Sequence, residues 1–175
     1  MKKVDRRDFI ATAGLLGLSL PLAGTVRAQD ARARKPNVLF IVADDLGYAD
    51  LACYGRRDIA TPNIDRIAAE GVRFLQGYAN SSVCSATRTA LITGRYQYRL
   101  RVGLEEPVRG VPNIGLPPDH PTLPSLLKKA GYRTALIGKW HLGPHPAFGP
   151  RKSGYDHFYG FRGGGVDYYA HTDTA

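Results

Sequence analysis

Three short clusters in the sequence carry side chains whose types and spacing could do chemistry. The clusters are Asp44 with Asp45, Cys84 with Arg88, and Lys139 with His141. Adjacent carboxylates offer the oxygen ligands that hard divalent cations such as Ca2+ and Mg2+ prefer. A thiol is a nucleophile, and an arginine four residues later on a helix lies on the same face, where it can offset the charge of an anionic reacting centre. A lysine can hold an anionic oxygen, and a histidine can transfer a proton near neutral pH.

The segments around these clusters alternate between strand and helix patterns. A continuous apolar run predicts a buried strand at 38–43, and two further strands are predicted at 72–79 and 132–138. Apolar residues at helical spacing, with glycines at the ends, predict helices at 62–70, 85–93 and 123–130. Thr61 and Thr122 are the expected caps of the first and third of these helices. Residues 95–121 contain five prolines, which predicts a long irregular connection.

This element order predicts an α/β fold with a mainly parallel sheet flanked by helices. Ligands in such folds bind outside the carboxyl ends of the strands. Each cluster follows one predicted strand: Asp44 the first, Cys84 the second and Lys139 the third. Each cluster by itself also fits a purely structural role. The two aspartates could form a turn, Cys84 could be a buried cysteine, and Lys139 could be a solvated surface lysine. Their convergence at one edge of the sheet is what favours a functional site.

The excess positive charge of the chain is concentrated at its N-terminus. The 175 residues carry a formal net charge of +9, of which +5 falls in residues 1–35. The remaining +4 gives little support for nucleic-acid binding, so we expect no nucleic-acid partner.

Residues 1–28 resemble a twin-arginine signal peptide. Arg6 and Arg7 precede an apolar stretch at 11–24, and residues 26–28 form a small-x-small cleavage site. The apolar stretch is shorter than the roughly 20 residues of a spanning helix, which favours a cleaved signal over a membrane anchor. We therefore predict a signal peptide at 1–28, a linker at 29–35, and export by the twin-arginine machinery to the bacterial periplasm or the extracellular space.

The two cysteines allow a different interpretation. In an oxidising compartment Cys53 and Cys84 could form a disulfide. A non-catalytic exported fragment with this Cys53–Cys84 disulfide is therefore an alternative to an enzyme.

Three segments resemble motifs of the sulfatase family. Residues 84–95 read CSATRTALITGR and resemble the motif in which Cys-x-Pro-Ser/Thr-Arg precedes an apolar pair and Thr-Gly-Arg. Residues 131–143 read GYRTALIGKWHLG and are similar to the second family motif at every position. Residues 36–47 read PNVLFIVADDLG and resemble the opening strand and metal-binding pair. By this resemblance, residues 36–175 are the N-terminal portion of an incomplete sulfatase catalytic domain with an alkaline-phosphatase-like fold.

The resemblance implies a sulfuric ester hydrolase similar to the arylsulfatases. In the family, a formylglycine-generating enzyme oxidises the motif cysteine, and the hydrate of the resulting aldehyde attacks the sulfur of a sulfate ester beside a divalent cation. The implied cofactors are therefore formylglycine, made from Cys84, and Ca2+ or, as second choice, Mg2+. The implied catalytic residues are Cys84, Arg88, Lys139 and His141, with the sulfate bound by Lys139 and His141, and the implied metal ligands are Asp44, Asp45 and Cys84.

Two features depart from the family pattern. Ala86 occupies the position where the family has proline, the residue that pre-sets the backbone read by the modifying enzyme. Members of the family are also much longer and supply further metal ligands, so we expect this chain to be inactive alone. The implied substrate is a sulfated small molecule or a sulfated carbohydrate. A phosphodiester or phosphonate ester hydrolase of the same superfamily is the enzymatic alternative.

Overall fold

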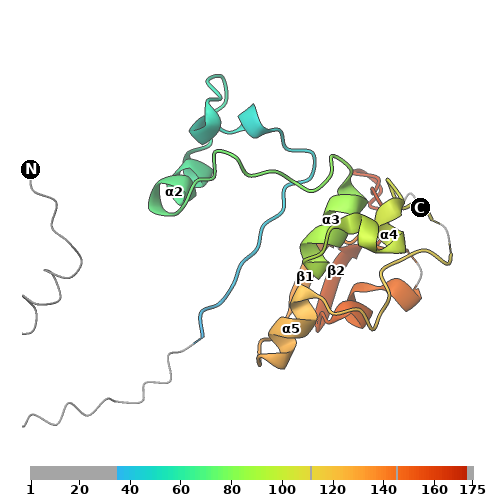
Figure 1. Ribbon diagram of the computed structural model, residues 1–175. Coiled ribbons are helices and arrows are strands. Elements are labelled where there is room, and N and C mark those ends of the chain that lie inside the picture. The colour runs from blue at the N-terminus through green and yellow to red at the C-terminus, as the bar shows by residue number, and fades with distance from the viewer. Residues whose placement is uncertain (1–34, 111, 145, 173–175) are drawn as a thin grey trace, which may run out of the picture. The chain divides into compact units, whose positions relative to one another are not determined.

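The computed structural model describes residues 35–110, 112–144 and 146–172 (Figure 1). Its contacts divide the chain into two units, residues 1–41 and residues 42–175. The predicted signal peptide at 1–28 and residues 29–34 of the predicted linker lie outside the described residues. Within the described ranges, no helix is both long and apolar enough to cross a membrane.

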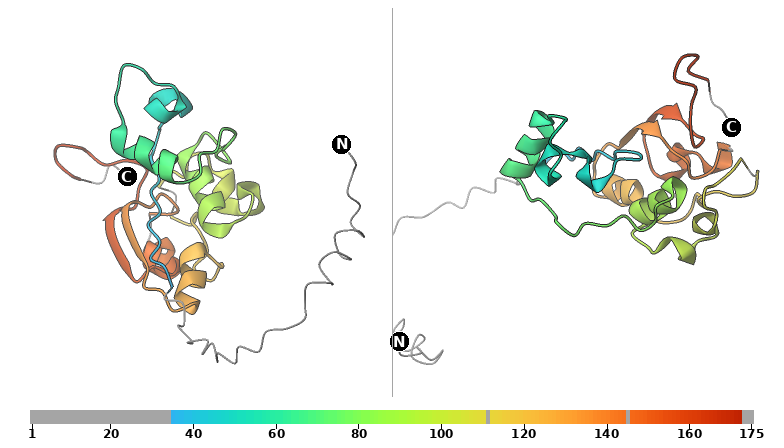
Figure 2. Two further views of the ribbon diagram at one scale, coloured as in Figure 1. Left: turned by 90° about the vertical axis from the view of Figure 1, so that its left-hand side faces the viewer. Right: turned by 90° about the horizontal axis from the view of Figure 1, so that it is seen from above.

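The sheet consists of two parallel strands, β1 (Ala135–Lys139) and β2 (His157–Phe161), which lie side by side (Figures 1 and 2). Their register pairs Ala135 with His157 and Lys139 with Phe161. The predicted strand at 132–138 is confirmed in its second half. Its partner β2 was not predicted, but the two strands are parallel, as expected of the sheet. The strands approach closely at Gly138 and Gly160, because a Cβ on Gly160 would lie 2.0 Å from the carbonyl oxygen of Gly138.

All three predicted helices form. They are α2 (Pro62–Glu70), α3 (Cys84–Thr93) and α5 (Leu123–Lys129). Thr122 caps α5 as predicted, since its hydroxyl accepts the Ser125 N–H. Thr61 does not cap α2 with its side chain; its hydroxyl instead donates to Asp65 at 3.0 Å and accepts the Ala52 N–H.

The predicted irregular connection at 95–121 contains two short helical segments. These are a 3-10 turn at Gln97–Arg99 and the one-turn helix α4 (Arg101–Leu104). Further 3-10 turns lie at Tyr48–Asp50, Ala52–Tyr54, Pro146–Phe148 and Pro150–Ser153. The hydrophobic core joins α3 and α4 to the residues that follow β1; its buried members are Ile92, Val102, Val108, Leu116, Trp140 and Leu142.

Two predicted strands do not form. Residues 38–43 form no strand, and Leu39 is 86% exposed. Residues 72–79 contain a turn at residues 75–76 and no strand, and Val72 and Tyr78 are exposed. A buried parallel strand needs backbone partners on neighbouring strands. Within the described residues β1 and β2 pair with each other, and these two apolar runs stay unpaired.

Candidate active site

Helix α3 places Cys84 and Arg88 on one face. Val83 is extended, with φ −98° and ψ 131°, and Gly94 is left-handed, with φ 65°, so the helix begins at Cys84 and ends one residue before this glycine. Ala86, in the position where proline was expected from the family motif, is fully buried in the first turn. Arg88 lies one turn after Cys84, which puts both side chains on the same side of the helix.

The end of β1 positions Lys139 and His141. Trp140 between them is buried, and its indole N–H donates to the carbonyl of Phe148 at 2.8 Å. Strand-like pairing continues beyond β1, since the His141 N–H donates to the Arg162 carbonyl at 3.1 Å. His141 itself has a left-handed backbone, with φ 57°, and is 5% exposed. The two side chains are therefore anchored through the core residue between them.

Asp44, Arg88 and Lys139 form one charged cluster. Lys139 Nζ lies 2.7 Å from Asp44 Oδ2, and Arg88 Nη2 lies 3.6 Å from Asp44 Oδ1. Arg88 also donates through Nη1 to the Lys139 carbonyl at 2.8 Å. Partial burial by itself would raise the pKa of Asp44, but the hydrogen bond and charge of Lys139, aided by Arg88, outweigh it and lower this pKa. One carboxylate thus faces two cations, which leaves the cluster with net positive charge.

Cys84 and His141 are in direct contact. The Sγ atom of Cys84 lies 3.2 Å from Nδ1 of His141, and Nε2 of the same ring lies 3.0 Å from the Val108 carbonyl. Burial lowers the pKa of His141; the hydrogen bond to Val108 opposes this effect, while the charges of Lys139 and Arg88 reinforce it. A neutral, buried imidazole therefore faces the side chain at position 84.

The structure brings together five of the six predicted site residues. Asp45 is the sixth; it is exposed, and its backbone is left-handed, with φ 59°. Within the described residues, no group of three His, Cys, Asp or Glu side chains is placed to hold one metal ion. The carboxylates of Asp44 and Asp45 offer the oxygen ligands that Ca2+ and Mg2+ prefer, but a Ca2+ ion binds six to eight oxygen ligands. The described residues therefore fit part of a cation site and do not complete one.

The structure does not contain the disulfide of the alternative interpretation. Both cysteines are free thiols. The Cys53 N–H donates to Asp65 at 2.8 Å, beside α2, whereas the Cys84 thiol contacts His141.

Three groups at the site were not found from the sequence. The carbonyls of Val108 and Arg162 hold the ring and the backbone of His141. The hydroxyl of Ser85 accepts the Val108 N–H at 3.0 Å. Carbonyl groups occur at every residue, so no residue type in the sequence could have indicated the first two. Ser85 lies inside the cysteine motif, and its position there was the one available signal.

Comparisons with known proteins agree with this arrangement. A family model described as Sulfatase matches residues 36–175. Arylsulfatase H of the dog (Canis lupus familiaris) is 45% identical over 142 residues, which cover 74% of this chain and 25% of that protein. N-acetylgalactosamine-6-sulfatase of the pig (Sus scrofa) is 39% identical over 164 residues, which cover 86% of this chain and 30% of that protein.

Solved structures are similar as well. The crystal structure of Ps i-CgsB superimposes with a TM-score of 0.69 and 42% identity, over 77% of this chain and 30% of that one. Its complex with k-i-k-neocarrahexaose gives a TM-score of 0.65 and 41% identity, over 73% of this chain and 28% of that one. The chain thus spans between 25% and 30% of the length of these relatives. The predicted α/β fold of the alkaline-phosphatase and sulfatase type is confirmed, and the chain belongs to the sulfatase family.

Proposed function

We propose that the full-length protein hydrolyses sulfate esters, with Cys84 converted to formylglycine as its nucleophile. The observation that carries this proposal is the contact of 3.2 Å between Cys84 Sγ and His141 Nδ1. Cys84 is the first residue of α3. Arg88 lies one turn further along the same helix, and its guanidinium donates a hydrogen bond to the backbone carbonyl of Lys139. A nucleophile position, a proton-transferring group and two cations for an anionic substrate are thereby gathered from distant parts of the sequence.

The proposed reaction has two displacement steps. The thiol of Cys84 stands in the structure for the hydrated aldehyde that the modified side chain would carry. One hydroxyl of the hydrate would attack the sulfur of the sulfate ester, the bond between sulfur and the ester oxygen would break, and the alcohol would leave with a proton. The second hydroxyl would then lose its proton to a base, for which His141 is in place. Its oxygen would form the aldehyde C=O bond while the bond from the same carbon to the first, sulfated oxygen breaks and releases sulfate. Water would restore the hydrate from the aldehyde.

Lys139 and Arg88 stabilise the negative charge on the sulfuryl oxygens during both displacements. Fixed cations in a partly buried site need no reorganisation during the reaction, which is why they lower its barrier. Lys139 has a side chain only 10% exposed, and Arg88 Nε is buried with no hydrogen-bond partner among the described residues. Arg88 thus retains an unused hydrogen-bond donor.

A divalent cation, Ca2+ or Mg2+, belongs to this proposal. Asp44 and Asp45 would be its ligands in this chain, together with the side chain at position 84. The cation would supply Lewis-acid stabilisation of the reacting group. Because the described residues offer only part of a ligand set, the remaining ligands have to come from elsewhere in the full-length protein.

A sulfated carbohydrate is the substrate class that the comparisons favour. One relative is named an N-acetylgalactosamine-6-sulfatase, and a similar structure contains k-i-k-neocarrahexaose. Simple aryl sulfates are the probes with which the chemistry is tested, since other relatives are named arylsulfatases.

The test is a comparison of ester classes with the full-length protein co-produced with a formylglycine-generating enzyme. Initial rates are measured on an aryl sulfate, on a sulfated carrageenan oligosaccharide and on an aryl phosphodiester, with Cys84→Ala as the matched control. The proposal expects turnover of the sulfate esters that Cys84→Ala abolishes. A preference for the phosphodiester would overturn the sulfatase assignment in favour of a phosphodiesterase of the same superfamily.

We further propose that the protein is exported by the twin-arginine machinery. The support is the sequence pattern of residues 1–28, with paired arginines ahead of an apolar stretch. Replacing Arg6 and Arg7 with lysine is expected to retain the protein in the cytoplasm of a bacterial host. Unchanged periplasmic or extracellular yield would contradict this proposal.

A further inference from the structure

The imidazole ring of His141 is held from several sides. Its Nε2 lies 3.0 Å from the Val108 carbonyl, and a carbonyl can only accept a hydrogen bond. Nε2 therefore carries the hydrogen, and in the neutral ring the lone pair of Nδ1 points at Cys84 Sγ. Gly164 closes another side, because a Cβ at that position would lie 2.8 Å from Cε1 and Nε2 of the ring. The position of the Val108 carbonyl thus decides which ring nitrogen meets the nucleophile.

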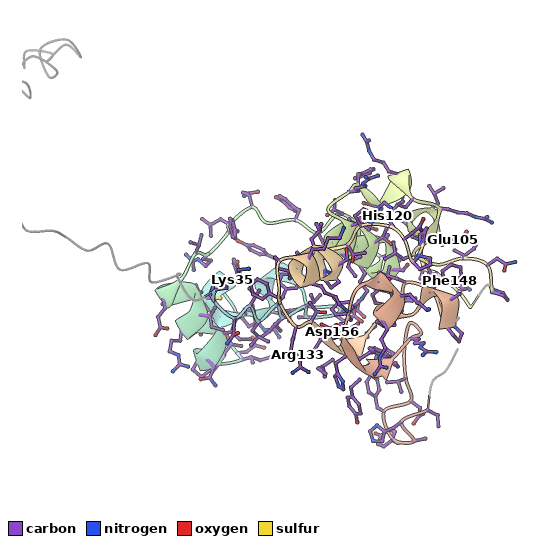
Figure 3. All side chains as sticks on the ribbon, turned by 90° about the horizontal axis from the view of Figure 1, so that it is seen from below. Lys35, Glu105, His120, Arg133, Phe148 and Asp156 are labelled. Carbon is purple, nitrogen blue, oxygen red and sulfur yellow. The ribbon has the colours of Figure 1, made fainter. Side chains whose placement is uncertain are left out.

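Ser85 fixes the segment that supplies this carbonyl. Its hydroxyl accepts the Val108 N–H at 3.0 Å and donates to the Glu105 carbonyl at 3.2 Å. Ser85 is fully buried and Val108 is 5% exposed, so water does not substitute for these bonds. Glu105, labelled in Figure 3, lies on the segment that follows α4. One hydroxyl on the first turn of α3 therefore ties residues 105–108 to the helix that begins with Cys84.

We propose that Ser85 is a positioning residue for the reaction. Through Val108 it sets the orientation of the His141 ring, and so holds Nδ1 against the side chain at position 84. The first turn of α3 then carries both the nucleophile, at position 84, and Ser85, which positions the His141 ring beside it. The catalytic consequence rests on the proposed sulfatase function, while the effect on the ring does not.

Removing the hydroxyl separates a positioning role from a structural one. In Ser85→Ala the buried Val108 N–H and Glu105 carbonyl lose their shared partner, so the segment shifts to find others. We expect kcat on an aryl sulfate to fall about 10- to 100-fold, because small displacements of a catalytic group have effects of this size, and KM to stay nearly unchanged.

A matched control lies one turn along the same helix. Thr89 is as fully buried as Ser85, but its hydroxyl donates to the Ser85 carbonyl at 2.9 Å, within α3. Thr89→Val therefore removes a buried hydroxyl without touching residues 105–108. It is expected to leave kcat and the His141 ring as they are in the unchanged protein, whatever it does to stability.

The deciding readout is nuclear magnetic resonance of the full-length protein labelled with 15N in its histidine rings and produced with the Cys84 thiol intact. The Nε2–H signal of His141, assigned by its loss in His141→Gln, is expected to exchange slowly with solvent. Ser85→Ala should shift this signal and accelerate its exchange, and Thr89→Val should not. If Ser85→Ala does not fold, Ser85→Cys, which keeps the size but accepts hydrogen bonds weakly, serves in its place.

A ring signal in Ser85→Ala or Ser85→Cys identical to that of the unchanged protein would overturn the proposal. So would equal changes in the Thr89→Val control. If the ring responds as expected but the full-length protein hydrolyses no sulfate ester, the positioning of His141 by Ser85 stands and the proposed function fails.

Discussion

Asp44 and Lys139 lie 95 positions apart in the sequence, and their side chains form an ion pair of 2.7 Å. Asp44 follows the apolar run at 38–43, and Lys139 ends β1. Arg88 joins them from α3 at 3.6 Å from the same carboxylate. This three-part cluster is where the separate motifs of the sequence meet.

Loss of the lysine charge should impair catalysis more than folding. In the full-length protein, Lys139→Met keeps most of the aliphatic bulk but removes the ammonium that faces the sulfuryl oxygens. We expect kcat on an aryl sulfate to fall about 100- to 1000-fold, the usual effect of deleting one fixed donor from a site of developing charge. Lys129→Met, an exposed position on α5, is the control and should leave kcat unchanged. A Lys139→Met enzyme with normal kcat would remove Lys139 from the proposed mechanism.

Metal removal should abolish the activity reversibly. After treatment with a chelator, we expect the full-length protein to lose turnover and to regain it on addition of Ca2+, or less fully of Mg2+. Asp45→Asn leaves the ion pair of Asp44 in place and tests the second carboxylate alone. It should raise the Ca2+ concentration needed for half-maximal activity by about tenfold or more. Full activity in the presence of excess chelator would exclude the proposed cation.

The carboxylate of Asp156 should make the free energy of unfolding depend on pH in the acidic range. Asp156 (Figure 3) bonds to Lys128 Nζ at 2.5 Å and accepts the Thr134 N–H at 2.9 Å, thereby linking α5 to the start of β1. The hydrogen bond from Lys128, followed by that from Thr134, lowers the pKa of Asp156 from 3.8 to about 2. A lowered pKa in the folded state means that this stabilisation is complete above 3.8 and is lost as the pH falls towards 2.

Asp156→Asn should therefore lower the free energy of unfolding at neutral pH, and its difference from the unchanged protein should shrink on acidification. Urea unfolding of both proteins across this pH range measures the difference directly. Asp119→Asn, in an exposed loop, should show no such trend. A difference that stays constant down to pH 2 would show that Asp156 acts through its shape and not its charge.

Trp140 should be the largest single contributor to stability next to the site. Its ring is 2% exposed, stands edge-on to Tyr155 at 6.3 Å, and bonds to the Phe148 carbonyl. Trp140→Phe should cost about 1–3 kcal/mol, because it removes the hydrogen bond from the indole N–H to the Phe148 carbonyl and leaves part of the buried ring volume unfilled. Tyr159→Phe, on an exposed side chain of β2, should change the unfolding free energy by less than about 0.5 kcal/mol. Equal effects of the two substitutions would contradict the role given to the indole.

Local signals in the sequence predicted the helices well. Thr122 caps the start of α5, and Gly94 ends α3. Both signals act on residues only a few positions away, so these helix ends do not depend on distant contacts. The strands were harder, since pairing is non-local: the run at 38–43 has the apolar pattern of a strand but no partner among the described residues. Strand β2 was missed because His157 and Gly160 interrupt its apolar pattern.

The site was predicted by a topological rule and not by contacts. Asp44, Cys84 and Lys139 each follow an apolar run, and the rule that ligands bind at the carboxyl ends of parallel strands brought them together. The three side chains lie in one region of the structure although the first two of these runs form no strand there. It could not show that Lys139 pairs with Asp44 or that Ser85 supports Val108, because both depend on side-chain geometry.

The state of Cys84 tests the central claim most directly. The protein is purified in full length from its own host, and the tryptic peptide from Phe74 to Arg88 is examined by mass spectrometry. The same peptide from a host without a formylglycine-generating enzyme, which should keep the thiol, is the control. We predict an aldehyde or its hydrate at position 84, with Ala86 accepted in place of proline. A free thiol, or a disulfide to Cys53, would contradict the proposal that this chain supplies a sulfatase nucleophile.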